Sequence, residues 1–172
     1  GLARLGQRVV LVDVDLRRPA QHRTFDASHQ TGMSDLLTAH GAIAEALQPT
    51  DVAGLAFIAA GPVPPSPTEL LGNQRMVDIL DQLKRDFDTV ILDGPPVLGL
   101  ADAPLLASMV GATVFVVEAS RGHRGATKAA LRRLKTGYTH VLGAVLTKFY
   151  TNHSSSDYSY YDQNYYQYGA DR

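Results

Sequence analysis

Three aspartates lie where predicted β-strands end, and carboxylates in this position suit a metal and phosphate site. Asp13 and Asp15 are two residues apart at the end of the apolar run Arg8–Val14, so both are expected to project to the same side of a sheet. Asp93 ends a second run, Thr89–Leu92, and the Gly-Pro-Pro that follows stops this strand. Carboxylates that converge repel one another unless a cation lies among them, and hard oxygen ligands suit Mg²⁺. A single strand-end aspartate is more often a turn or cap residue, but three at two strand ends predict a magnesium-dependent site.

The C-terminal segment 150–172 is the second candidate for chemistry. It carries seven of the eight tyrosines and no aliphatic residue before Ala170. Such a segment cannot bury enough apolar surface to offset the entropy of ordering it, so we expect a disordered tail that presents its phenols. Exposed phenols beside acidic residues are typical of a phosphorylation substrate, and a low-complexity tail without a chemical role is the alternative. The candidate sites are Tyr158, Tyr160, Tyr161, Tyr165, Tyr166 and Tyr168.

The elements that must position these residues alternate between strands and helices. Further strands are predicted at Leu55–Ala60, Ala112–Val117 and Val141–Leu146. Helices are predicted at Met33–Leu37, Ala42–Leu47, Glu69–Arg85, Ala103–Val110 and Arg124–Thr136, the third of them opened by a capping box of Ser66 and Glu69. The alternation predicts an α/β fold with a mostly parallel sheet sandwiched by helices. Ligands of such sheets bind at the carboxyl ends of the strands, where the aspartates lie.

Composition narrows the function classes. A chain of 172 residues is about one domain, and its net charge of −1 predicts no general attraction to nucleic acid or to an anionic membrane. The absence of cysteine excludes disulfides and thiolate metal sites. No apolar run reaches the roughly 18 residues needed to span a bilayer. The six histidines show no ligand spacing, so no metal role is assigned to them.

Several segments together resemble the bacterial tyrosine kinases. The run from Val10 to Pro19, VLVDVDLRRP, is similar to their second acidic motif, Walker A′. The run from Val90 to Pro96, VILDGPP, followed by Ala101-Asp102-Ala103, is similar to their Walker B segment. The stretches 31–37 and 62–71 and the terminal tyrosine cluster also match, so the resemblance covers essentially the whole chain in order.

The resemblance implies a P-loop NTPase-like fold and an ATP-dependent tyrosine autokinase that regulates capsular or extracellular polysaccharide synthesis and export. It implies ATP and Mg²⁺ as cofactors, with Asp15 and Asp93 holding the metal and Arg17 contacting the nucleotide. Arg17 and Arg18 alike could contact phosphate or a partner subunit, and solvated cations at the strand end are the alternative. Asp13 would orient or deprotonate the incoming phenol, and Asp13 and Asp15 could exchange roles. It also implies phosphorylation between subunits of a homo-oligomer, contact with the export machinery and a cognate phosphotyrosine phosphatase. The expected location is the cytoplasmic side of an inner-membrane protein, or a cytoplasmic partner of one.

The phosphate-binding P-loop, G-x-x-x-x-G-K-[ST], is missing from the sequence. Gly1 to Gly6 instead resembles the end of a helix with Gly6 as its C-cap, so we expect residues 1–149 to form a kinase domain without its first strand and P-loop, followed by the tail 150–172. Two alternatives remain: an ATPase that positions plasmids or division sites, and a non-catalytic scaffold with a phosphorylatable tail. A basic stripe along 121–135 is either a solvated face or a surface that attracts the acidic or phosphorylated tail of a neighbouring subunit; its members are Arg121, Arg124, Lys128, Arg132 and Lys135.

Overall fold

The computed structural model describes residues 1–38, 41–119, 123–137 and 139–149. The strands are β1 (Val9–Asp13), β2 (Leu47–Pro49), β3 (Leu55–Ile58), β4 (Thr89–Asp93), β5 (Thr113–Glu118) and β6 (Val141–Thr147). The helices are η1 (Leu2–Leu5, a 3₁₀ turn), α1 (Gln21–Thr24), α2 (Met33–Thr38), α3 (Ile43–Ala46), α4 (Pro67–Leu71), α5 (Gln74–Asp86), α6 (Asp102–Met109) and α7 (Arg124–Lys135). In this part of the chain no helix has the length and apolar character to cross a membrane.

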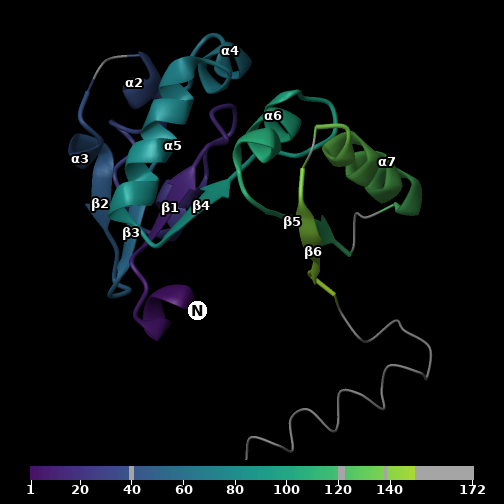
Figure 1. The fold of residues 1–172 in the computed structure, drawn as a ribbon, viewed down its shortest axis with the longest axis horizontal. Helices are drawn as coiled ribbons and strands as arrows, with labels where there is room; N and C mark the ends of the chain where they lie inside the picture. Colours follow the sequence, from purple (N-terminus) through teal and green to yellow (C-terminus); the bar gives the residue numbers. More distant parts are fainter. Residues whose placement is uncertain (39–40, 120–122, 138, 150–172) are drawn as a thin grey trace, which may run out of the picture.

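The strands form two sheets, which Figure 1 shows on either side of α6. The larger sheet has the order β2-β3-β1-β4, and the smaller consists of β5 and β6. β1 runs parallel to β3 and β4, β5 runs parallel to β6, and only the short β2 is antiparallel to its neighbour. The mostly parallel α/β architecture predicted from the alternating pattern is therefore confirmed.

The core lies in the half of the domain that contains the larger sheet. Val10 and Val12 of β1 are fully buried, as expected for a strand that is covered on both faces. The amphipathic helix α5 packs Met76, Ile79 and Leu83 against this core. The parallel register of β1 and β4 aligns the two strands within this core and places Asp13 opposite Asp93 at their ends.

Three predictions about helices and caps were wrong or incomplete. The predicted helix Glu69–Arg85 is two helices, because the chain turns at Gly72 and Asn73 and the Asn73 side chain accepts a hydrogen bond from the backbone N–H of Met76 (3.1 Å). The capping box is not formed, since Ser66 precedes α4 but its side chain makes no cap hydrogen bond. The predicted helix end at Gly6 is a 3₁₀ turn, and Gly6 has the expected left-handed conformation (φ 88°).

Within the described residues β4 and β5 each have a strand partner on one side only, and we name their two open edges the β4–β5 gap. There β4 pairs only with β1, and β5 pairs only with β6. Ile91 of β4 is 40% exposed and Val116 of β5 is 60% exposed, although both are apolar strand residues. A groove beside β4 is lined by Val90 and Leu92, by residues 80, 84, 87 and 88 at the end of α5, and by residues 109–111 at the end of α6.

Candidate functional site

Asp13 ends β1 and is the most enclosed of the three predicted acids, with 1% of its surface exposed. One carboxylate oxygen accepts the backbone N–H of Asp15 (3.1 Å), and the other accepts those of Ala20 (3.3 Å) and Gln21 (3.1 Å). Burial raises the pKa of Asp13 against the opposing effect of these hydrogen bonds, and the charge of Asp93 raises it further. Asp13 therefore closes the loop after β1 through its own side chain.

Asp93 lies directly opposite Asp13, because the two are paired in the parallel register of β1 and β4. One carboxylate oxygen of Asp93 accepts a 2.7 Å hydrogen bond from the side-chain amide of Gln21. Gln21 thus contacts both acids, Asp13 through its backbone and Asp93 through its side chain. This contact was not found from the sequence, because a glutamine after a turn carries no motif of its own.

Asp15 lies beyond the end of β1 and is less buried than Asp13. Its carboxylate accepts the backbone N–H groups of Arg17 (3.1 Å) and Arg18 (3.0 Å), which forms a tight turn. In the described ranges there is no group of three or more acidic, histidine or cysteine residues placed to hold a metal. The three aspartates are thus neighbours along two strand ends but do not enclose a cation site by themselves.

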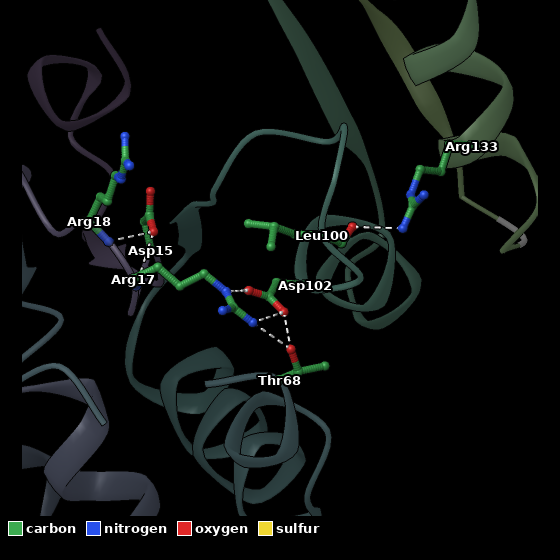
Figure 2. Close-up of polar contacts among 7 residues, drawn as sticks. All are labelled: Asp15, Arg17, Arg18, Thr68, Leu100, Asp102 and Arg133. Carbon is green, nitrogen blue, oxygen red and sulfur yellow. Dashed lines mark hydrogen bonds and ion pairs between the residues drawn. The ribbon is translucent and has the colours of Figure 1, made fainter. Parts of the chain in front are cut away.

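Arg17 is engaged with the start of α6 and with α4, as Figure 2 shows. Its Nε donates to Asp102 (2.6 Å), and one Nη donates to the Thr68 hydroxyl (2.9 Å). The Thr68 hydroxyl in turn donates to Asp102 (2.5 Å). Burial alone would raise the pKa of Asp102, which is 1% exposed, but the bonds from Arg17 and Thr68 outweigh it and lower that pKa. The network ties the loop after β1 to two helices.

Arg18 has a different environment from Arg17. Its side chain is exposed and in Figure 2 points away from the network of Arg17 and Asp102. Within the described ranges its guanidinium has no hydrogen-bond or ion-pair partner. Both arginines of the acidic motif were candidates for phosphate contact. In the structure Arg17 is bound by Asp102 and Thr68, whereas the guanidinium of Arg18 is free to contact an anion.

Gly32 holds the loop before α2 against the end of β3. The backbone N–H groups of Met33 and Ser34 donate to the carbonyls of Ala59 and Ala60, both at 2.8 Å. A Cβ at Gly32 would overlap the Ala59 carbonyl oxygen and the Gly61 nitrogen. Only glycine allows the two backbone segments to approach this closely.

The candidate tyrosine sites in 150–172 lie outside the described residues.

Comparisons with known proteins place this arrangement in a family. A family model described as an AAA domain matches residues 1–127. The tyrosine-protein kinase CapB of Staphylococcus aureus is 32% identical over 94% of this chain and 71% of its own length. The tyrosine-protein kinase Wzc of Salmonella typhi is 31% identical over 92% of this chain, but the chain spans only 22% of that longer relative. The solved kinase domain of the Escherichia coli tyrosine kinase ETK is 30% identical with a TM-score of 0.84, over 90% of this chain and 61% of that one. The chain therefore belongs to the bacterial tyrosine-protein kinase family.

Proposed function

We propose that this chain is part of an ATP-dependent protein-tyrosine kinase that phosphorylates its own C-terminal tyrosines in capsule or exopolysaccharide production. The observation that carries the proposal is the pairing of Asp13 with Asp93 at the carboxyl ends of parallel strands, with Asp15 and a free Arg18 beside them. Ligands of open α/β sheets bind at this edge. The kinase names of the matched relatives support the activity, and the capsule context of the family supports the setting.

Asp15 and Asp93 would hold magnesium together with the phosphates of ATP. Carboxylate oxygens are suitable ligands for this metal. Proteins usually bind Mg²⁺ through one or two carboxylates, and substrate phosphates and water complete the coordination. Bound magnesium neutralises charge on the transferring phosphoryl group. The side-chain amide of Gln21 fixes the direction of the Asp93 carboxylate.

The geometry favours different roles for Asp13 and Asp15. Asp13 is buried and already accepts three backbone N–H groups, so it acts as a positioning residue for the loop that carries Asp15 and Arg18. Asp15 and Asp93 would then be the two acids that lie next to the bound nucleotide and the incoming tyrosine phenol. Arg18 would contact phosphate, while Arg17 holds the loop against Asp102 and Thr68.

The β4–β5 gap supports the proposal that the kinase domain contains one more strand, followed by a P-loop. A single parallel strand between β4 and β5 would satisfy both unpaired edges and cover Ile91 and Val116. A P-loop after this strand would supply the backbone amides and the lysine that the present sequence lacks. This 172-residue chain should accordingly bind Mg-ATP no more tightly than millimolar. Micromolar binding in isothermal titration would contradict the proposed role of the gap.

The kinase activity is tested in the complete protein with ATP and Mg²⁺. Mass spectrometry should find phosphotyrosine within 150–172, and both Asp15→Asn and Asp93→Asn should remove it. Asp51→Asn, an exposed aspartate remote from the strand ends, is the matched control and should leave phosphorylation unchanged. Near-normal phosphotyrosine in Asp93→Asn would show that the wrong carboxylates were chosen. Nucleotide hydrolysis without phosphotyrosine would instead favour a positioning ATPase.

A further inference from the structure

The helix α7 carries an uncompensated row of positive charge. Its four members recur every three or four residues, and all are exposed: Arg124, Lys128, Arg132 and Lys135. At 3.6 residues per turn they fall within an arc of about 80°, while the helix buries Ala130 and Leu134 on another side. We name these four residues the α7 stripe. Within the described ranges none of them forms an ion pair or a side-chain hydrogen bond. Arg133 is not a member, since it projects elsewhere and donates to the carbonyl of Leu100 (2.9 Å).

The neighbouring elements supply no acid that could neutralise the stripe. From Ala119 to Phe149 the sequence contains seven lysines and arginines and no aspartate or glutamate. The adjacent helix α6 has one acid, Asp102, which is buried and bound by Arg17. Glu118 of β5 pairs with Lys148 (3.2 Å). Positive charge is therefore concentrated here in a chain whose total is slightly negative.

The composition of the exposed face of α7 argues against a lipid surface as its partner. Helices that lie on membranes insert bulky apolar side chains beside their cations. The exposed large apolar residues of the described chain include none from α7. A soluble anion with several spaced charges fits the stripe better than a bilayer does.

We propose that the α7 stripe binds the phosphorylated tyrosine tail of the same chain. This inference rests on the proposed function, which supplies the phosphates. Each phosphotyrosine carries nearly two negative charges and three strong acceptor oxygens, which suit arginine and lysine donors. The tail is otherwise only weakly acidic, so phosphorylation is the step that makes it a strong ligand for the stripe.

The spacing of charges agrees between helix and tail. Successive cations of the stripe four residues apart rise about 6 Å along the helix. Tyr158 and Tyr160, and likewise Tyr166 and Tyr168, are two residues apart, and side chains two residues apart in an extended segment are separated by about 6.6 Å. Paired phosphates on an extended tail thus match consecutive turns of α7.

The topology brings the same chain's tail to the correct end of the helix. β5 and β6 are parallel and α7 connects them, so α7 begins at the edge of the sheet where β6 ends. The stripe is about 17 Å long, and the eleven residues from Lys148 to Tyr158 can extend over about 35 Å. A short tether also gives an effective concentration in the millimolar range, which favours the tail of the same copy over that of another. Docking in this way would withdraw a phosphorylated tail from the active site of a neighbouring copy.

The test uses the full chain with a synthetic tail, so that its result does not depend on kinase activity. The protein has no cysteine, so Ala126→Cys on the far side of α7 and Ala170→Cys in the tail can be labelled for single-molecule energy transfer. One tail carries phosphotyrosine at positions 158, 160, 166 and 168, and the other is unmodified. The stripe variant replaces all four cations by Gln. Its control removes the same charge elsewhere, from the exposed Arg4, Arg23, Lys84 and Arg85.

Phosphorylation should raise the transfer efficiency at all protein concentrations, and the stripe variant should remove this rise while the control retains it. Free phosphorylated tail peptide should bind the full chain with its unmodified tail roughly tenfold more tightly for each added phosphate pair. A signal that grows with protein concentration would assign the stripe to the tail of a second copy and overturn the proposal. The proposal would also be overturned if the stripe variant and the control lost the rise in transfer efficiency equally. Stripe-dependent binding of phosphatidylglycerol vesicles by the unmodified chain would overturn it as well. Docking without kinase activity would leave this inference standing and refute only the proposed function.

Discussion

Replacement of Asp13 by asparagine should destabilise the domain, whereas the same change at Asp93 should not. Two backbone N–H groups, those of Ala20 and Gln21, share one oxygen of Asp13, and a third donates to the other oxygen. Asparagine keeps one oxygen and places an NH₂ group against at least one of these donors. Each hydrogen bond to a charged group contributes about 1.5–3 kcal/mol, and relief of the buried charge, which raises the pKa of Asp13, offsets part of the loss. We expect a net cost of about 3 kcal/mol at neutral pH.

Among the described residues the Asp93 side chain accepts one hydrogen bond, from the Gln21 amide, and the carbonyl oxygen of asparagine can still accept it. Asp93→Asn should therefore cost less than about 1 kcal/mol. Urea denaturation followed by circular dichroism measures both variants. With a slope near 2 kcal/mol per molar, Asp13→Asn should lower the midpoint by about 1.5 M, and Asp93→Asn by less than about 0.5 M. Equal midpoints for Asp13→Asn and the unmodified chain would refute the positioning role of Asp13 and return it to the candidates for phenol deprotonation.

Three further outcomes follow from the structure. Asp102→Asn should lower the urea midpoint at neutral pH. Because the folded-state pKa of Asp102 is lowered, the difference in midpoint from the unmodified chain should shrink as pH falls below about 4. A difference that is constant from pH 7 to pH 3 would contradict the ion pair with Arg17. Gly32→Ala should lower the free energy of unfolding by about 3 kcal/mol, because the added methyl group overlaps backbone atoms of Ala59 and Gly61. A loss of this size lowers the melting temperature by several degrees, which calorimetry measures. A melting temperature within about 2 °C of the unmodified chain would show that the loop moves aside. Changing the six candidate tail tyrosines to Phe should remove most phosphotyrosine from the complete protein without changing its affinity for nucleotide. Weaker nucleotide binding by this variant would show that the tail contributes to the nucleotide site.

The sequence predicted the elements whose pattern is local and failed where contacts between distant segments decide. The apolar runs that became β1, β3, β4, β5 and β6 were each predicted within a few residues, since each is a short run of aliphatic and β-branched residues between turn or helix signals. The break between α4 and α5 was missed because the apolar period continues across Gly72 while the cap of Asn73 overrides it. β2 was not predicted, and its first residue, Leu47, was taken for the end of a helix, since the pairing of β2 with β3 cannot be inferred from three residues.

The candidate site shows the same division. The acids were found because they end strands, and their pairing follows from the parallel register of β1 and β4. The partner of Arg17 was not found, because Asp102 lies 85 positions away in the sequence and reaches Arg17 only through the folding of α6 against α4. Side-chain contacts of this kind separate a phosphate-binding arginine from a structural one, and the sequence alone treats Arg17 and Arg18 alike.

The division into two sheets also bears on how the domain unfolds. The contiguous buried cluster includes residues from Val10 to Leu106 and none from β5, α7 or β6. The smaller sheet is held mainly by its own pairing, by the contact of α6 with α7 and by the bond from Arg133 to the Leu100 carbonyl. Segments with few buried apolar contacts open at lower free energy than the core to which they are attached. The β5–α7–β6 unit should therefore exchange its amide hydrogens through partial opening while the larger sheet stays closed, so that the part of the protein next to the tyrosine tail is also the part that loosens first.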